Sequence, residues 1–340
     1  MTHVTIVGGG LSGLALARAC LDAGRSVHVL EGRDRPGGRI LSVDGLDLGP
    51  AWIWPGQPRI AALLDRLGLI PFEQYSHGHL LVEGPDGTVQ RGRGPGGMEG
   101  ALRVPGGLAA VTDALAATLP PGVLRTGCRV TGIAAAADGV RLDTSDGPLD
   151  AGCVVLALPP RLAADLPAPD LIDDAARAAL SAVPTWMAGH AKAVAAYDRP
   201  FWRDAGLSGD AFSRRGPMVE MHDASAPGGP AALFGFLGVP PAARRDRAAL
   251  DGAIRAQLAR LFGPDAAEPR ALHVRDWALD EFTATAADHD PPPGHPRYGP
   301  LPDPIPGRLL LAGTEMAPTH GGLVEGALEA AEAAFARLPD

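Results

Sequence analysis

Three glycines and one glutamate near the start of the chain have the spacing of a dinucleotide-binding loop. Gly8, Gly10 and Gly13 form the pattern G-x-G-x-x-G, and Glu31 follows 21 residues after Gly10. In such a loop one glycine permits the tight turn, one lets the backbone approach a pyrophosphate, and one lets a helix pack close to a strand. An acid at this distance accepts hydrogen bonds from an adenosine ribose and disfavours the 2′-phosphate of NADP. The pattern predicts a bound dinucleotide.

The elements around this loop have sequences that can position it. Residues 4–7 are a short apolar run of the kind found in buried parallel strands, and residues 27–30 predict the next strand. A helix predicted over about residues 12–23 would direct its N-terminal N–H groups at the phosphates. Gly24 stands where a C-terminal cap glycine is preferred.

Basic residues directly after Glu31 favour FAD over NAD. Arg33, Arg35 and Arg39 surround the glycine pair 37–38. An additional arginine contact with the same pyrophosphate suits a larger cofactor that is held permanently, since guanidinium groups pair well with phosphate oxygens. A solvated basic turn is the alternative interpretation of this segment.

Segments spread along almost the whole chain resemble, in the same order, the motifs of the flavin-containing amine oxidase family (monoamine oxidase-like). The matching segments are residues 31–39, 47–53, 104–108, 154–160 and 313–315. Lys192, ten residues before Trp202, matches the active-site lysine of that family. The chain is thereby identified as a compact member of the family, and the resemblance implies FAD-dependent oxidoreductase chemistry.

The resemblance also implies a set of site residues. Those expected to bind the cofactor are Gly8, Gly10, Leu11, Ser12, Gly13, Glu31, Gly32, Arg33, Gly38, Arg39, Ala51, Trp52, Ile53, Val130, Trp277, Gly313, Thr314, Glu315, Gly322, Leu323 and Val324. Lys192 is the expected catalytic residue, with its ammonium reaching flavin N5 through a water. Its apolar neighbours and the rarity of lysine in this chain favour that role over a surface lysine. For Glu315 a carboxylate that stabilises a helix start is the alternative.

The chain departs from the family's pattern in three places. Only about 50 residues separate Trp54 from Val104, so a large helical insert must be largely missing. No cysteine follows Trp277 in the segment where some members attach flavin covalently, so we expect non-covalent FAD. Leu323 stands where the family has a cage tyrosine, and the other cage position falls near Ala286 or Ala287. The substrate contacts are therefore expected from Leu323 and from His320, for which a plain loop histidine is the alternative.

Composition excludes several classes of protein. The net charge of −9 argues against nucleic acid or an anionic membrane as partner. No apolar run is long enough for a transmembrane helix, and the N-terminal sequence lacks the features of a signal peptide. The three cysteines have no metal-ligand spacing and are expected to be buried, reduced thiols, and no histidine spacing suggests a metal. We expect a cytoplasmic protein without metal, and a homodimer remains open.

The motifs predict an α/β fold with two domains. An FAD-binding, Rossmann-like doubly wound parallel sheet is expected from residues 1–70, 103–182 and 283–340. Residues 71–102 and 183–282 are expected to form a substrate domain, an antiparallel sheet with a helix over about 245–262. In the first insertion, 80–82 and 88–89 predict a hairpin around the turn 84–87.

The function expected from the resemblance is amine oxidation. A hydride would pass from a carbon next to nitrogen to flavin N5, giving an imine that hydrolyses, and O2 would reoxidise the flavin to give H2O2. An FAD-dependent desaturase or isomerase acting on C–C bonds of a hydrophobic substrate is one alternative, since the aromatic cage is missing. A flavin-binding structural or sensor protein is another, although such a protein needs no lysine at N5.

Overall fold

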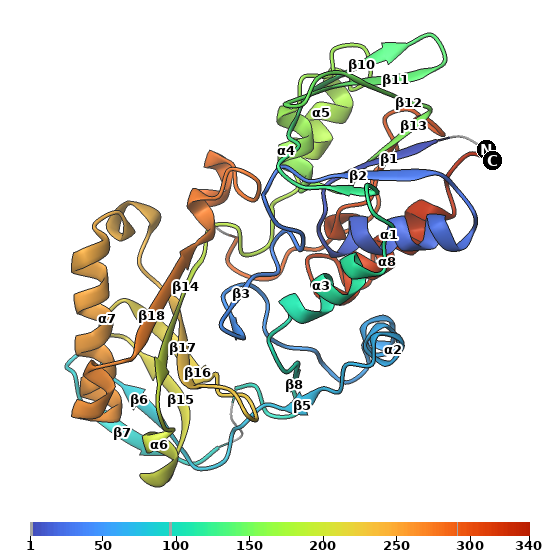
Figure 1. The fold of residues 1–340 in the computed structure, drawn as a ribbon. Helices are drawn as coiled ribbons and strands as arrows, with labels where there is room; N and C mark the ends of the chain where they lie inside the picture. Colours follow the sequence, from blue (N-terminus) through green and yellow to red (C-terminus); the bar gives the residue numbers. More distant parts are fainter. Residues whose placement is uncertain (1–2, 95–96, 291) are drawn as a thin grey trace.

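A parallel five-stranded sheet is the centre of the larger half of the molecule (Figure 1). The computed structural model describes residues 3–94, 97–290 and 292–340. The strand order is β19-β13-β1-β2-β9, with β1 at Val4–Val7, β2 at Val27–Leu30, β9 at Leu124–Arg125, β13 at Cys153–Leu156 and β19 at Leu309–Leu311. Strands β1, β13 and β19 are buried along their whole length, as apolar strands covered on both faces must be.

Two separate apolar cores cover the two faces of this sheet. On one face lie α1 (Leu11–Asp22), α2 (Pro58–Leu67), α3 (Ala109–Ala117) and α8 (Val324–Phe335). On the other lie α4 (Pro160–Asp165), α5 (Asp174–Ser181) and a three-stranded antiparallel sheet of β10 (Val130–Ala136), β11 (Gly139–Thr144) and β12 (Leu149–Ala151). The expected fold class, a Rossmann-like parallel sheet with a second α+β unit, is confirmed.

A seven-stranded sheet forms the smaller half, at the lower left of Figure 1. Its order is β18-β14-β17-β16-β15-β6-β7, with β6 at His79–Glu83, β7 at Val89–Gly92, β14 at Ala191–Tyr197, β15 at Leu207–Ser213, β16 at Met218–Asp223, β17 at Ala231–Leu237 and β18 at Ala271–Asp276. The helix α7 (Arg247–Phe262) covers one face, and α6 (Phe201–Asp204) precedes β15. The predicted hairpin 80–89 and the long helix are present.

One pairing in this sheet differs from the expected antiparallel arrangement. Strand β6, from the first insertion, lies parallel to β15, whereas the other neighbours in the sheet are antiparallel. The difference arises because β6 comes from a distant part of the chain and is not joined to β15 by a hairpin, which would enforce antiparallel pairing.

Short antiparallel ladders lie outside the larger sheets. The strands β3 (Ser42–Val43) and β4 (Leu46–Asp47) form a hairpin, and β5 (Phe72–Glu73) pairs with β8 (Leu102–Arg103). The division of the chain into an FAD-binding domain and a substrate domain stays a proposal. Its support is that the five-stranded sheet and the seven-stranded sheet draw on different parts of the chain.

Alternation along β14 decides which side chains can reach the first sheet. Its residues Ala191, Ala193 and Ala195 pack under α7, whereas Val194 and Ala196 pack toward residues of the β3–β4 region. Because side chains in a strand alternate between faces, Lys192 shares the second face and points between the two halves.

Candidate functional site

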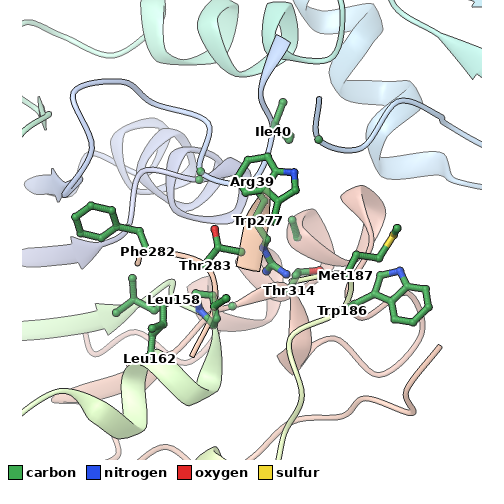
Figure 2. A pocket seen from close by; sticks show the side chains of 18 of the residues that line it. Arg39, Ile40, Leu158, Leu162, Trp186, Met187, Trp277, Phe282, Thr283 and Thr314 are labelled. Carbon is green, nitrogen blue, oxygen red and sulfur yellow. The ribbon is translucent and has the colours of Figure 1, made fainter. Parts of the chain in front are cut away.

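A cavity of about 1160 Å³ lies between the two halves of the molecule. Its walls come from the loop after β1, the segment after β2, the strand β14 and the start of α8. In the view of Figure 2, Phe282 and Leu158 lie on one side of the pocket and Trp186 and Met187 on the other, with Trp277 between them. The cavity is at or above the upper end of the ~300–1,000 Å³ typical of ligand pockets, and it follows the usual placement at a domain interface.

Most of the predicted site residues line this cavity. They are Gly8, Gly10, Leu11, Ser12, Glu31, Gly32, Arg33, Gly38, Arg39, Ala51, Trp52, Val130, Lys192, Trp277, Gly313, Thr314, Gly322, Leu323 and Val324. Gly13, Ile53, Glu315 and His320 are not among the lining residues. Residues that lie far apart in the sequence thus meet around one space.

Gly13 and Ile53 act behind the cavity wall. A Cβ on Gly13 would lie 2.0 Å from the carbonyl oxygen of Gly8, so this glycine permits close packing of helix on strand, as the motif predicts. Ile53 is buried in the core and pairs through its backbone with Leu102. Contact of Ile53 with a ligand is therefore not supported.

Glu315 and His320 do not line the cavity, and each has a partner elsewhere in the structure. The fully buried carboxylate of Glu315 accepts two hydrogen bonds from the guanidinium of Arg39, at 2.6 and 3.1 Å, so it holds Arg39 at the cavity and does not line it itself. His320 lies in the turn before α8, and its Nδ1 is 3.9 Å from Glu329 of that helix. Its ring packs toward α8, and its contact with substrate stays a prediction.

The N-terminus of α1 is open toward the cavity. Gly10 is the N-cap residue and no side chain caps the helix, so its first N–H groups are available to an anion. Gly38 has φ +59°, and a Cβ there would lie 3.2 Å from the Cα of Gly10. The two glycines form a cradle that any side chain would fill.

Glu31 and Arg33 stand at the end of the cavity formed after β2. The buried Glu31 carboxylate accepts hydrogen bonds from the backbone N–H of Gly9 at 2.7 Å and of Arg33 at 2.8 Å. The Nη2 of Arg33 donates to Asp280 at 2.6 Å and to Thr283 at 2.9 Å. The charge of Arg33 is therefore already balanced by protein carboxylates, which weakens its expected role as a phosphate ligand.

Lys192 is buried at the other end of the cavity. Its Nζ donates a 2.6 Å hydrogen bond to the carbonyl of Gly49 and lies 4.6 to 5.6 Å from the ring centres of Trp52, Phe234 and Phe236. Burial lowers the pKa of Lys192 to about 8; nearby Asp47 acts to raise it and Arg103 to lower it. The amine of Lys192 can therefore gain or lose a proton near pH 8.

Several lining residues were not foreseen from the sequence. They are Trp186, Met187, His190, Glu220, Phe236 and His295. Two signals were available: an acid inside the otherwise apolar run 218–221, and an aromatic residue shortly before the Lys192 strand. Neither signal says which way the side chain points.

Trp186 and His295 occupy the neighbourhood of the missing aromatic cage. The cage positions Leu323 and Ala286 both line the cavity with small or aliphatic side chains. The rings of Trp186 and His295 meet edge to face at 4.9 Å, and a Cβ on Gly322 would lie 3.1 Å from the Cβ of Trp186. The aromatic wall on this side therefore comes from the segment before β14.

Other expectations concern metals, thiols and membranes. Among the described residues, no group of three or more histidine, cysteine or acidic side chains is arranged to hold a metal ion. Cys20, Cys128 and Cys153 are free and buried, as expected. Within the described ranges, no helix combines the length and apolar character needed to cross a bilayer.

The residues present fit FAD. The cavity extends from the uncapped start of α1 and the buried Glu31 to Lys192, so its ends match the two ends of an extended dinucleotide. The cradle of Gly10 and Gly38 leaves room at the position of the pyrophosphate. The cavity therefore fits FAD both in its shape and in its hydrogen-bonding groups.

Comparisons with known proteins agree with this site. Residues 88–338 match the family model "Flavin containing amine oxidoreductase", and residues 6–67 match the NAD(P)-binding Rossmann-like domain. The chain is 28% identical to a Mycobacterium tuberculosis protein named as the flavin-containing monoamine oxidase AofH, over 98% of this chain and 96% of the relative. That alignment extends over 449 positions, more than the 340 residues here, so the relative carries segments that this chain lacks.

Solved structures show the same fold. Putrescine oxidase bound to putrescine superimposes with a TM-score of 0.81 at 23% identity, covering 98% of both chains. Cyclohexylamine oxidase from Brevibacterium oxydans superimposes with a TM-score of 0.82 at 21% identity, again covering 98% of both chains.

Proposed function

The chain belongs to the flavin containing amine oxidoreductase family and is an FAD-dependent oxidoreductase, and we propose that it oxidises a small amine at the carbon next to nitrogen. Bound FAD would accept the hydride from that carbon and pass the electrons to O2, so that the products are an imine, which water hydrolyses, and H2O2. The FAD is held without a covalent bond, since no cysteine follows Trp277, where some members of the family attach the flavin.

The buried Lys192 is the main support for this proposal. Lys192 is the single lysine of the chain, and it is buried at the cavity wall with its Nζ fixed by the Gly49 carbonyl. Burying a charged amine is costly, so its presence among apolar and aromatic side chains favours a role in the reaction over a role in stability. As a residue that faces the reacting atoms, Lys192 is the proposed catalytic residue.

Other residues of the cavity bind the cofactor and exclude water. The start of α1 and the glycine cradle bind the pyrophosphate, and Glu31 binds the ribose hydroxyls of the adenosine. Arg39 is kept at the cavity by the carboxylate of Glu315. The rings of Trp186 and Trp277 exclude water from the space beside Lys192.

Lys192 also selects the protonation state of the substrate. At neutral pH it remains largely a cation, since its lowered pKa is about 8. A cation at this place repels an ammonium and tolerates a neutral amine, which is the form whose neighbouring C–H can be oxidised. Relatives support an amine as substrate, since one solved neighbour holds putrescine.

Oxidation of a C–C bond is the second candidate. The cavity wall includes the aliphatic side chains of Met98, Met187 and Leu323, which a hydrophobic substrate would contact. This candidate is less favoured, because the matching family model describes amine oxidoreductases.

The test combines a spectrum with an oxidase assay. The purified protein is expected to be yellow, to release its flavin into the supernatant on acid precipitation, and to form H2O2 with members of an amine panel. Flavin that stays with the precipitate would contradict non-covalent binding. Released FAD without peroxide from any amine, but with anaerobic bleaching by a lipid or polyene, would replace the proposal by the C–C desaturase.

A further inference from the structure

An aromatic side chain forms part of the wall at the end of the cavity where Glu31 lies. Phe282 follows the short helix η3 (Trp277–Leu279), on the stretch by which the chain returns from the seven-stranded sheet to the five-stranded one. A Cβ on Gly32, the residue after Glu31, would lie 2.5 Å from the Phe282 ring, so the ring contacts the backbone there. Both residues line the cavity, and Figure 2 shows Phe282 on the side of the pocket opposite Trp186. The ring therefore lies at the end of the cavity expected to hold the adenosine of FAD.

Two guanidinium groups from separate segments lie against this ring. The Cζ of Arg33 and the Cζ of Arg129 are each 5.2 Å from its centre. Arg33 follows Gly32 directly, whereas Arg129 precedes β10, and their side chains are 11% and 51% exposed. The attraction between a cation and an aromatic ring is stronger where water is excluded. Arg33 therefore makes the stronger of the two contacts.

Hydrogen bonds from Arg33 also fix the segment that carries Phe282. Its Nη2 donates to Asp280 at 2.6 Å and to Thr283 at 2.9 Å, on either side of Phe282 in the sequence. The backbone N–H of Phe282 donates to the same Asp280 carboxylate at 3.0 Å, and Arg275 pairs with its other oxygen. Asp280 is buried, and separating a buried ion pair is strongly unfavourable. The ring is thus held in place by its own segment as well as by the two guanidinium groups.

Arg33 connects this segment to the acid expected to bind the adenosine ribose. The backbone N–H of Arg33 donates to Glu31 at 2.8 Å. Because protein carboxylates already balance the charge of the Arg33 guanidinium, its contacts favour holding a protein segment over binding phosphate. No cysteine follows Trp277 in the sequence, so retention of FAD depends on non-covalent contacts at places such as this one.

We propose that Phe282 retains FAD by closing the adenosine end of the cavity, and that Arg33 and Arg129 hold its ring in that position. FAD then leaves only after the ring separates from Gly32 and the contacts of residues 280–283 break. Phe282 is a positioning residue for the cofactor and takes no part in the redox step, so its role is the same for any substrate.

The experiment measures how fast FAD leaves the holoenzyme. FAD-loaded protein is diluted in the presence of phosphodiesterase, which cleaves released FAD to the more fluorescent FMN, so the rise in fluorescence gives the dissociation rate. Phe282→Ala is expected to release FAD about 10- to 100-fold faster than wild type, which is the range for the loss of two cation–π contacts and one apolar contact. Phe282→Tyr keeps the ring and should stay within about threefold of wild type.

Three further measurements distinguish retention at this end from a general loosening of the protein. Arg129→Met replaces a half-exposed side chain and should accelerate release about 2- to 5-fold. Phe335→Ala also removes a ring that faces an arginine, Arg25 at 6.0 Å, but Phe335 is not among the described residues that line the cavity, so release should be unchanged. The visible spectrum of the bound flavin should be the same in Phe282→Ala as in wild type, since the isoalloxazine is expected at the Lys192 end.

Several results would overturn the role of Phe282. Release at the wild-type rate from both Phe282→Ala and Arg129→Met would show that the ring does not retain the cofactor. Equal acceleration in Phe335→Ala, or a shifted flavin spectrum in Phe282→Ala, would show a general loosening instead. Should Phe282→Ala not fold, Phe282→Leu keeps an apolar side chain without a ring face and gives the same comparison. No substrate is added, so the result does not depend on whether amines are oxidised.

Discussion

The Nζ of Lys192 donates a 2.6 Å hydrogen bond to the backbone carbonyl of Gly49. Lys192 belongs to β14, the second strand from one edge of the seven-stranded sheet, and Gly49 follows the β3–β4 hairpin. The contact joins the two halves at the wall of the cavity. The position of the ammonium is thereby fixed by backbone, which is less free to move than a side-chain partner would be.

Replacement of Lys192 tests its catalytic role. Lys192→Met is expected to retain FAD at the wild-type ratio to protein and to lower kcat/KM for amines about 100-fold, since it removes a charge preorganised at the reacting atoms. Stopped-flow spectroscopy of flavin reduction and reoxidation identifies the affected step. Arg270→Met removes an exposed positive charge and serves as the control. Unchanged kinetics in Lys192→Met would remove the catalytic assignment.

The pKa of Lys192 can be measured directly. Because the chain has one lysine, isotope-labelled lysine gives one side-chain resonance from this residue type. In protein freed of FAD its midpoint is expected at about 8. Since the folded pKa lies below the unfolded one, the unfolded state binds more protons between about pH 8 and 10.5, and the free energy of unfolding rises with pH there by about 3 kcal/mol. Denaturant titrations of Lys192→Met should lack this rise.

Glu31 is predicted to control how much FAD the protein retains. Glu31→Ala removes the acceptor of the Gly9 and Arg33 N–H groups and the expected ribose contact, so FAD should dissociate about 10- to 100-fold more readily. The ratio of flavin absorbance to protein absorbance after dialysis measures this loss. An occupancy equal to that of wild type would contradict the ribose contact.

Two glycine-to-alanine substitutions distinguish a loss of room for the cofactor from a change in the conformational freedom of the chain. Gly38→Ala places a methyl group 3.2 Å from Gly10 at positive φ, so it should weaken FAD binding and lower stability by about 1–2 kcal/mol. Gly252→Ala in α7 meets open space and should stabilise the protein by about 0.5–1 kcal/mol without affecting FAD. Thermal unfolding with and without added FAD distinguishes the two effects; equal FAD affinity in both variants would argue against the cradle.

The pair Arg39–Glu315 is predicted to be strongly coupled. Arg39→Met leaves the fully buried Glu315 carboxylate without its partner and should destabilise the protein by about 3–5 kcal/mol. Adding Glu315→Gln removes the stranded charge, so the double variant should recover much of that loss. Denaturant unfolding of the two single variants and the double variant gives the coupling energy. Additive effects would show that the pair is not a unit.

Local features that depend on neighbouring residues could be predicted from the sequence. The apolar runs 4–7 and 27–30 form the strands β1 and β2, and the glycine-rich segment leads into the helix α1, as the short-range patterns predict. The order of the motifs also identified the family and its cofactor. Lys192 was selected in the same way, from its motif and its apolar neighbours.

Which side chains from different elements meet depends on the three-dimensional fold. Asp210 meets His222 because the register of β15 against β16 brings them together, whereas Glu220 is two residues from His222 on the same strand; the sequence does not state that register. Likewise Glu315 serves Arg39 instead of lining the cavity, and His320 packs on α8. Arg39 and Glu315 are 276 residues apart in the sequence, and even the nearer pair of Asp210 and His222 belongs to two different strands. A shift of one residue in a strand would turn its side chains to the other face and exchange a ligand-binding side chain for a core one.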